Sequence, residues 1–100
     1  MDSFANVEIS GKIVAIYQNK NGKSLRLKYQ DSHGDSHFLS AHLFNQLEDQ
    51  AKQDNLGNGD VVNLIGELRS YQKTVGDQNL TQYSVRASAY SLLSKVGAPI

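Results

Sequence analysis

Hydrophobic and polar residues alternate along much of the chain with the two-residue period of β-strands. In residues 7–18 the odd-numbered positions are mostly apolar, and polar residues fill the even-numbered positions up to Lys12. Because successive side chains of a strand point to opposite faces, this pattern predicts a first strand with one buried face. Val14 and Ile16 break the alternation. We therefore expect the end of this strand to be covered on both faces, by barrel closure or by a partner subunit.

Turn-forming residues separate the next two predicted strands. Asn21-Gly22 predicts a type I′ hairpin turn, because both residues readily adopt positive φ angles. Residues 25–30 alternate again and carry basic side chains on the polar face, which predicts a second strand. The polar cluster of residues 31–35 predicts a turn, so we expect a third strand over residues 36–43.

One helix is expected after the third strand. Asn45 can serve as its N-cap residue, and Glu48 three positions later would complete a capping box. Apolar residues recur at the four-residue spacing of a buried helix face: Leu43, Leu47 and Ala51. Gly57 suits the left-handed position that follows a helix, so the helix is expected to end there.

Two longer strands are expected in the second half, over residues 61–71 and 81–92, with residues 73–79 forming a long, mobile hairpin loop. The resulting order is that of the OB-fold, a five-stranded Greek-key barrel with one α-helix between strands three and four. An SH3-like barrel is the main alternative, but it does not normally place a three-turn helix at that point. We therefore predict a single all-β OB-fold domain over residues 1–100, with a flexible C-terminal end from about residue 93.

Composition excludes several classes of function. The 100 residues include no cysteine, which excludes disulfides, zinc–thiolate sites and thiol catalysis. Ten basic residues balance ten acidic ones, so bulk positive charge cannot drive nucleic-acid binding. No apolar run approaches the ~20 residues needed to cross a bilayer, and the N-terminus does not resemble a signal peptide. We expect a soluble cytoplasmic protein with no membrane partner.

Charge is nevertheless distributed unevenly. Residues 1–30 hold five basic and two acidic side chains. Residues 31–60 hold one basic and six acidic side chains, and residues 61–100 hold four basic and two acidic ones. This partition can place a basic face opposite an acidic one, although an unevenly charged solvated surface would give the same counts.

Catalytic and metal-binding patterns are weak. His33, His37 and His42 fall within ten residues, but a strand would place His37 and His42 on opposite faces because they are five residues apart. Gly57-Asn58-Gly59 precedes a strand, whereas a phosphate-binding glycine loop must open a helix. We therefore expect surface histidines, no metal ion, no cofactor and no enzymatic activity.

Aromatic and basic residues interleave in the predicted strands, as single-stranded nucleic-acid binding requires. Flat side chains stack on bases, and cations follow the phosphates. Most aromatic residues at strand spacing are buried, and Tyr29 is expected in the core. Phe38 is as readily exposed as buried, because Leu39 can fill the core position beside it. Tyr71 ends a strand beside a polar segment and is expected to be exposed.

In residues 59–69 a Gly-Asp turn leads into an apolar strand and then into Gly, any residue, Leu and a base. This segment resembles the fourth strand of bacterial and phage single-stranded DNA-binding proteins, and it is the most specific of several such segments. Residues 82–87 are similar to the family's fifth strand, residues 38–47 to its third strand and helix start, and residues 6–13 to its first strand. The resemblance implies sequence-tolerant binding of single-stranded DNA by a homodimer or homotetramer with an OB-fold.

The resemblance also implies particular roles for single residues. Phe38 matches the family's stacking Trp, Phe44 its stacking Phe, and Arg69 the basic residue after Gly-x-Leu. The family's second stacking Trp falls at Lys73, with Tyr71 two residues earlier on the same strand face as a substitute.

The chain also departs from the family. It has no Trp, and Ser40 and Gln46 stand where the family usually has bases, which implies weaker binding or a different path across the barrel. No acidic residue follows Asp77, whereas family members typically continue into an acidic C-terminal tip that recruits replication and repair proteins. In this respect the chain is similar instead to tailless relatives, such as primosomal replication protein N-type domains and compact phage or plasmid forms.

We therefore predict non-sequence-specific binding of single-stranded DNA in replication, recombination or repair, with replication proteins as further candidate partners. The expected stacking residues are Phe38, Phe44, Tyr71 and Tyr83. The expected phosphate contacts are Lys12, Lys23, Arg26, Lys28, Arg69, Lys73 and Arg86. The alternative is an OB-fold module for protein interaction in a replication or primosome assembly, with little affinity for nucleic acid.

Overall fold

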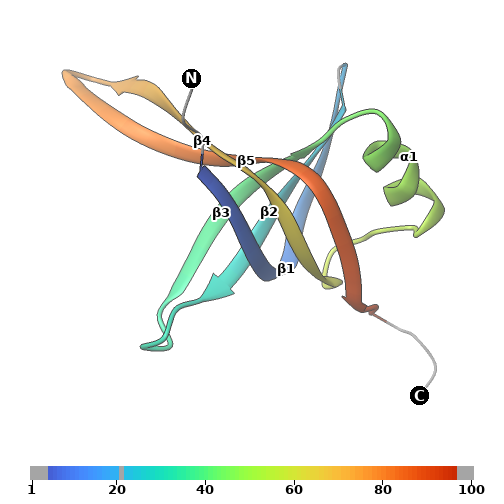
Figure 1. The fold of residues 1–100 in the computed structure, drawn as a ribbon. Helices are drawn as coiled ribbons and strands as arrows, with labels where there is room; N and C mark the ends of the chain where they lie inside the picture. Colours follow the sequence, from blue (N-terminus) through green and yellow to red (C-terminus); the bar gives the residue numbers. More distant parts are fainter. Residues whose placement is uncertain (1–4, 21, 97–100) are drawn as a thin grey trace.

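Five strands and one helix make up the computed structural model, which describes residues 5–20 and 22–96 (Figure 1). The elements are β1 (Ala5–Asn19), β2 (Gly22–Gln30), β3 (Ser36–Leu43), α1 (Gln46–Gln53), β4 (Val61–Val75) and β5 (Gln78–Ser94). The strands form a closed barrel in the order β1-β2-β3-β5-β4, in which only β3 and β5 pair in parallel. This order and the place of the helix confirm the predicted OB-fold. Within the described residues, no helix has the length and apolar character needed to cross a membrane.

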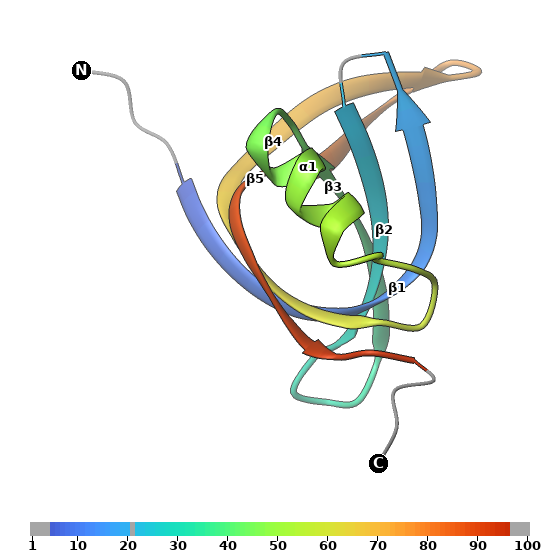
Figure 2. The same cartoon turned by 90° about the vertical axis from the view of Figure 1, so that its right-hand side faces the viewer.

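The core of the barrel is formed by the apolar series that the alternation predicts. Ile13, Leu25 and Leu27 are fully buried, and each such side chain contributes about 1.5–3 kcal/mol relative to exposure. Tyr29 continues this series and packs, partly buried, at the edge of the core, as predicted. Helix α1 covers one end of the barrel, where Ala51 is buried (Figure 2).

A β-bulge at Val14 explains why the alternation breaks in the first strand. Ile13 pairs with Leu27, and Ala15 pairs with the preceding residue of β2, so Val14 is an additional residue in β1. The bulge allows both Ile13 and Ile16 to pack toward the core, the first fully buried and the second partly. Barrel closure therefore accounts for the double apolar pattern, and the predicted self-association stays a prediction.

The short turns of the first half largely follow the prediction. β1 and β2 form the expected hairpin and pair as far as Asn19 and Gly22, so Gly22 is the first residue of β2 rather than part of the turn. Asn21, the other residue of the predicted type I′ turn, lies outside the described residues. In the β2–β3 turn, one carboxylate oxygen of Asp31 accepts hydrogen bonds from the backbone N–H groups of His33 (2.9 Å) and Asp35 (3.0 Å). These bonds explain why this polar cluster forms a tight turn.

The helix ends differ from the sequence prediction. Asn45 precedes α1 with φ 53°, but its side chain makes no capping hydrogen bond, and Glu48 instead accepts a hydrogen bond from Gln18 (3.0 Å). The prediction of a capping box is therefore wrong. The left-handed residue after the helix is Asn55 (φ 52°) rather than Gly57, since asparagine also tolerates this conformation. With eight residues, α1 is also shorter than the three turns expected.

The polar segment between β4 and β5 is not a loop. Val75 pairs with Gln78, and the turn uses Gly76, whose φ of 63° suits a tight hairpin. The side chains of Thr74 and Asn79 are hydrogen-bonded across the strands (2.9 Å). Polar residues therefore extend the sheet by pairing with one another, and the predicted mobile loop is wrong. The paired residues 70–83 form a projecting hairpin, which we call the β4–β5 arm (Figure 1).

The C-terminal segment is held by one buried carboxylate as far as the structure describes it. Strand β5 continues to Ser94, within the end that the sequence predicts to be flexible. Beyond it, the backbone N–H of Val96 donates to Asp60 (2.8 Å), and the ammonium group of Lys95 donates to the same carboxylate (3.1 Å). Residues 97–100, the remainder of that prediction, lie outside the described residues.

Candidate nucleic-acid interface

Cross-strand pairing brings predicted phosphate and stacking residues into one row. Lys12 pairs with Lys28, and Lys28 pairs with Phe38, so the three side chains lie side by side across β1, β2 and β3. Residues paired directly across a sheet share a face. The next residues along the two strands, Leu27 and Leu39, are buried in the barrel. The row therefore faces outward, away from the core.

Phe38 is exposed and already has a cation over its ring. Its side chain is 51% exposed, whereas Leu39 is buried and fills the adjacent core position, one of the two arrangements that the sequence allows. The guanidinium carbon of Arg26 lies 5.0 Å from the centre of the Phe38 ring. An exposed ring with an attached cation can stack on a base while the cation meets a phosphate.

A second aromatic–cation pair lies at the opposite end of β3. The guanidinium carbon of Arg86 is 5.1 Å from the centre of the Phe44 ring, and His42 packs beside the same ring at 6.4 Å between ring centres. Phe44 and Arg86 line a hollow of about 370 Å³ with Gln46 at the start of α1. The structure therefore joins two residues that the sequence places 42 positions apart.

A further hollow opens where β3 and β5 separate. The two strands pair only over Ser40–His42, so they diverge toward the beginning of β3. The resulting space of about 390 Å³ is called here the aromatic hollow. It is lined by Tyr29, Phe38, Leu68, Thr81, Gln82 and Tyr83, among others. Tyr83 is 54% exposed, so the hollow brings together two predicted stacking residues from different strands.

The remaining stacking candidate, Tyr71, does not join them. Tyr71 and Tyr83 lie in adjacent cross-strand rows of the β4–β5 arm and therefore on opposite faces. Tyr71 is half-exposed, as predicted, and shares its face with Arg69 and Lys73. Arg69 forms an ion pair with Glu67 at 3.1 Å, which reduces the charge that it offers to a phosphate.

Lys23 is separated from the other basic candidates. It pairs with Leu43, a fully buried core residue, and so lies on the opposite face of β2 from Arg26 and Lys28. Its position near the β1–β2 turn places it away from the aromatic hollow.

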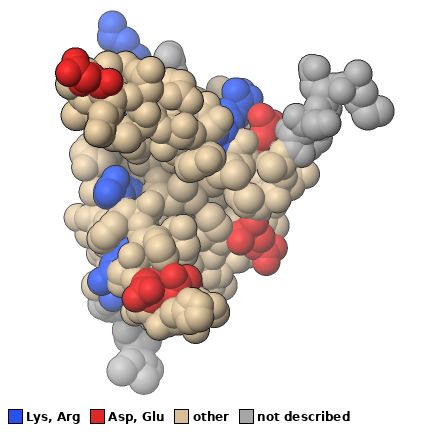
Figure 3. All heavy atoms as spheres, turned by 90° about the vertical axis from the view of Figure 1, so that its left-hand side faces the viewer, with Lys and Arg blue, Asp and Glu red and all other residues tan. Residues whose placement is uncertain are grey.

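Carboxylates are absent from most of this sheet. Strands β2, β3 and β5 contain no Asp or Glu, whereas α1 and the turns around it carry much of the acidic middle third of the chain. On the face shown in Figure 3, acidic and basic side chains lie mainly around a largely uncharged middle, in places side by side. The net charge of zero therefore hides a sheet surface on which three strands lack carboxylates and two of these, β2 and β5, carry basic side chains.

Sequence reasoning missed one exposed aromatic residue on this surface. Tyr17 is 56% exposed and belongs to an outward row that continues through Ser24 and His42 to Arg86. Simple alternation assigns Tyr17 to the buried series of the first strand, but the bulge at Val14 reverses its direction. The break in the pattern at Val14 was the available signal.

The histidines occupy different environments at the surface. The Nε2 atom of His37 lies 2.7 Å from a carboxylate oxygen of Asp31, and this hydrogen bond lowers the pKa of Asp31 below its ordinary value. The His37 ring also stacks on Tyr29, with 5.4 Å between ring centres. The His42 ring instead forms a hydrogen bond with the hydroxyl group of Ser24. No group of three or more side chains that could hold a metal ion occurs within residues 5–20 and 22–96.

Several solved structures with the same fold are single-stranded DNA-binding proteins. The mitochondrial protein Rim1 of S. cerevisiae has a TM-score of 0.77 and 19% identity, covering 94% of this chain and 98% of its own. A small single-stranded DNA-binding protein of Streptomyces coelicolor has a TM-score of 0.66 and 21% identity, and the match covers 91% of this chain and 95% of the Streptomyces chain. A Plasmodium falciparum protein solved with single-stranded DNA has a TM-score of 0.63 and 14% identity, and the match covers 95% of this chain and 97% of the Plasmodium chain.

Sequence comparisons add no closer relationship. No protein-family model matches the chain, and no curated protein matches it significantly. At the identities of the structural matches the likeness concerns the fold, and the chain therefore has the OB-fold barrel found in these single-stranded DNA-binding proteins.

Proposed function

We propose that the chain binds single-stranded DNA without sequence preference, in DNA replication, recombination or repair, and performs no chemical step. The observation that carries the proposal is the exposed Phe38 ring, with Arg26 over it and the aromatic hollow beside it. Structural similarity to proteins named for single-stranded DNA binding, one of them solved with single-stranded DNA, supports the proposal.

The arrangement around Phe38 suits consecutive nucleotides. One base stacks on the free side of Phe38 and a neighbouring base on Tyr83, and each stacked base contributes about 1–3 kcal/mol. Arg26 and Lys28 stand beside Phe38 and are available to the phosphates. Every base has a flat face, so this mode of binding tolerates any sequence.

The second aromatic–cation pair extends the proposed surface along the junction of β3 and β5. Phe44 lies just beyond the paired segment Ser40–His42, with Arg86, the strand partner of His42, over its ring, and the aromatic hollow lies before that segment. A strand that follows this junction would meet stacking residues at both ends.

We propose in addition that the chain acts as a homodimer or homotetramer in the cytoplasm, together with replication proteins. One subunit offers only a few stacking positions, and linking two of them would raise the overall affinity through an increased effective concentration.

The intrinsic fluorescence of the protein provides a direct test. The chain contains five Tyr and no Trp, so stacked bases are expected to quench tyrosine emission during titration with a dT oligomer of about 35 nucleotides. If three to six phosphates are contacted, the logarithm of the affinity should fall with the logarithm of salt concentration with a slope of about −2 to −4. Tyr71→Phe and Tyr83→Phe would identify the quenched residues without removing their rings. Unchanged emission at micromolar protein in low salt would contradict the proposal and favour a protein-interaction module.

A further inference from the structure

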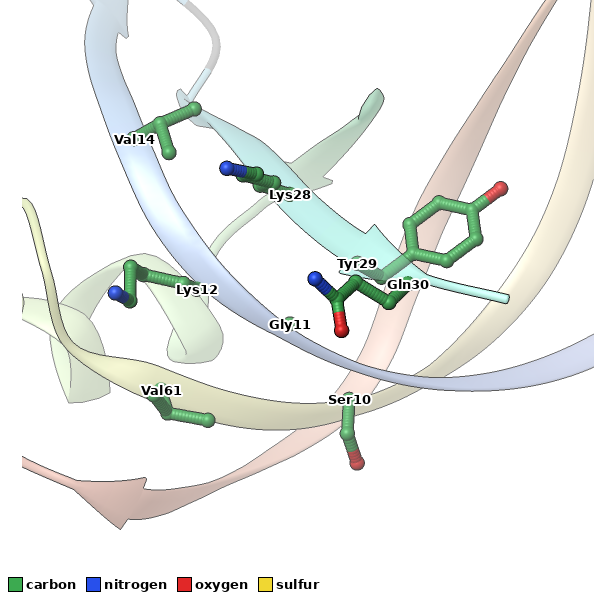
Figure 4. A pocket seen from close by; sticks show the side chains of 8 residues that line it. All are labelled: Ser10, Gly11, Lys12, Val14, Lys28, Tyr29, Gln30 and Val61. Carbon is green, nitrogen blue, oxygen red and sulfur yellow. The ribbon is translucent and has the colours of Figure 1, made fainter. Parts of the chain in front are cut away.

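A third hollow, with a distinct chemical character, lies on the outer side of β1 and β2. Strand β1 pairs with β4 from Ala5 to Lys12 and with β2 from Lys12 onward, so β1 and β2 diverge at the Lys12–Lys28 pair. The divergence leaves a space of about 410 Å³, which we call the lysine hollow (Figure 4). Its lining includes Ser10, Lys12, Val14, Lys28, Tyr29 and Gln30.

Two like charges face each other at this hollow without compensation. Lys12 and Lys28 are directly paired across the strands, an arrangement that destabilises a sheet when both residues are charged. None of the ion pairs formed between described residues includes either lysine. The nearest acid on β1 is Glu8, four residues or about 13 Å along the strand. An anion bound between the two ammonium groups would convert this repulsion into attraction.

The size and lining of the hollow suit a nucleotide rather than a bare ion. Its volume lies within the range of ligand-binding pockets, about 300–1,000 Å³. Figure 4 shows the side chains of Lys12 and Lys28 extending toward the same side of the hollow, with Gln30 and Ser10 further along it. The Gln30 amide can donate and accept hydrogen bonds, and the Ser10 hydroxyl, which donates to the side-chain oxygen of Asn63 (2.8 Å), can still accept one from a base edge or a sugar.

The lysine hollow is continuous with the proposed DNA surface. Lys28 pairs with Phe38 on its other side, and Tyr29 lines both the lysine hollow and the aromatic hollow. We propose, on the basis of the proposed function, that the bound DNA strand continues from Phe38 over β2 onto β1. Lys12 and Lys28 then hold one of its phosphates, and the attached nucleotide lies in the lysine hollow.

The test compares salt dependence in two double variants that remove equal charge. Each phosphate contact with single-stranded DNA contributes about 0.7 to the salt slope, so losing the one phosphate held by both lysines in Lys12→Gln/Lys28→Gln should reduce the steepness of that slope by about 0.7 for a dT oligomer of about 35 nucleotides. The control Lys20→Gln/Lys52→Gln, with lysines in the β1–β2 turn and on α1, should leave the slope within about 0.3 of the unaltered chain. Equal changes in the two double variants would overturn the lysine hollow as a binding site while leaving the proposed function intact. If the unaltered chain binds no oligomer, both proposals fail.

NMR separates a DNA phosphate from a free anion. In the unaltered chain, the backbone amide signals of Gly11 and Gln30 should shift when dT oligomer is added at micromolar concentration, and these shifts should be lost in Lys12→Gln/Lys28→Gln. Inorganic phosphate serves as the second probe. Shifts with millimolar phosphate but none with the oligomer would assign the hollow to a free anion and contradict the proposed path.

Discussion

Replacing both Phe38 and Tyr83 with Ala is expected to reduce the affinity for single-stranded DNA by about two to three orders of magnitude. Both rings are more than half exposed and line the same hollow, so the double variant removes two stacking positions without opening the core. Each lost stack costs about 1–3 kcal/mol, and each tenfold loss of affinity corresponds to about 1.4 kcal/mol. Fluorescence anisotropy of a labelled dT oligomer would measure the loss, with each single variant losing about tenfold.

The matched control for this variant is Val75→Ala/Leu80→Ala. Both residues are exposed apolar positions on the β4–β5 arm, 52% and 40% exposed, and neither lines the aromatic hollow. The control should bind within about threefold of the unaltered chain, because general loss of exposed apolar area has little effect on stacking. Retention of full affinity by Phe38→Ala/Tyr83→Ala would show that the strand takes another route.

Replacing Asp60 with Asn is expected to lower the free energy of unfolding by about 3 kcal/mol near neutral pH, because it breaks a buried charge-assisted network. Asp60 is only 1% exposed, and its carboxylate accepts hydrogen bonds from the backbone N–H groups of Gly57 (2.9 Å) and Val96 (2.8 Å) and from Lys95 (3.1 Å). An amide would turn a donor toward groups that can only donate. Urea denaturation followed by circular dichroism would measure the change.

The effect of Asp60 should depend on pH. Burial by itself would raise the pKa of Asp60, but the hydrogen bonds from Val96, Gly57 and Lys95 outweigh burial and lower the pKa below its ordinary value. The unfolded chain therefore binds the proton more readily, and the stabilisation is complete above an unfolded pKa of about 4 and is lost as the pH falls through the lower folded value. The difference between the two proteins should shrink below about pH 4.

The control for Asp60 is the exposed carboxylate of Asp35 in the β2–β3 turn. Asp35→Asn should change the unfolding free energy by less than about 0.5 kcal/mol, as surface substitutions usually do. An equally small effect of Asp60→Asn would mean that the C-terminal end of β5 does not depend on this carboxylate.

The barrel could be predicted from the sequence because its core follows local rules. Ile13, Leu25 and Leu27 repeat with the period of a strand, and the polar turn at residues 31–35 separates two strands, so neither feature needs tertiary information. The β4–β5 arm could not be predicted in the same way. Its polar residues, such as Thr74, have the composition of a loop, and only the facing strand supplies the hydrogen-bond partners that make them part of a sheet.

The candidate site was only partly predictable for the same reason. Phe38 could be recognised as a candidate for an exposed stacking residue because the neighbouring Leu39 can fill the core position in its place. Its partner across the hollow, Tyr83, could be identified as an aromatic residue but not placed, since the hollow depends on where β3 and β5 stop pairing. Simple alternation predicts the wrong face for Tyr17, because the bulge that redirects its side chain arises from pairing with β2.

The central claim is most directly tested by anisotropy of a fluorescent dT oligomer of about 35 nucleotides, titrated with the unaltered protein in low and physiological salt beside a duplex of equal length. The arrangement of Phe38, Arg26 and the aromatic hollow predicts salt-sensitive binding of the single strand, with the duplex bound far more weakly because its bases are already stacked. Equal binding of both forms, or no binding of the single strand at micromolar protein in low salt, would contradict it.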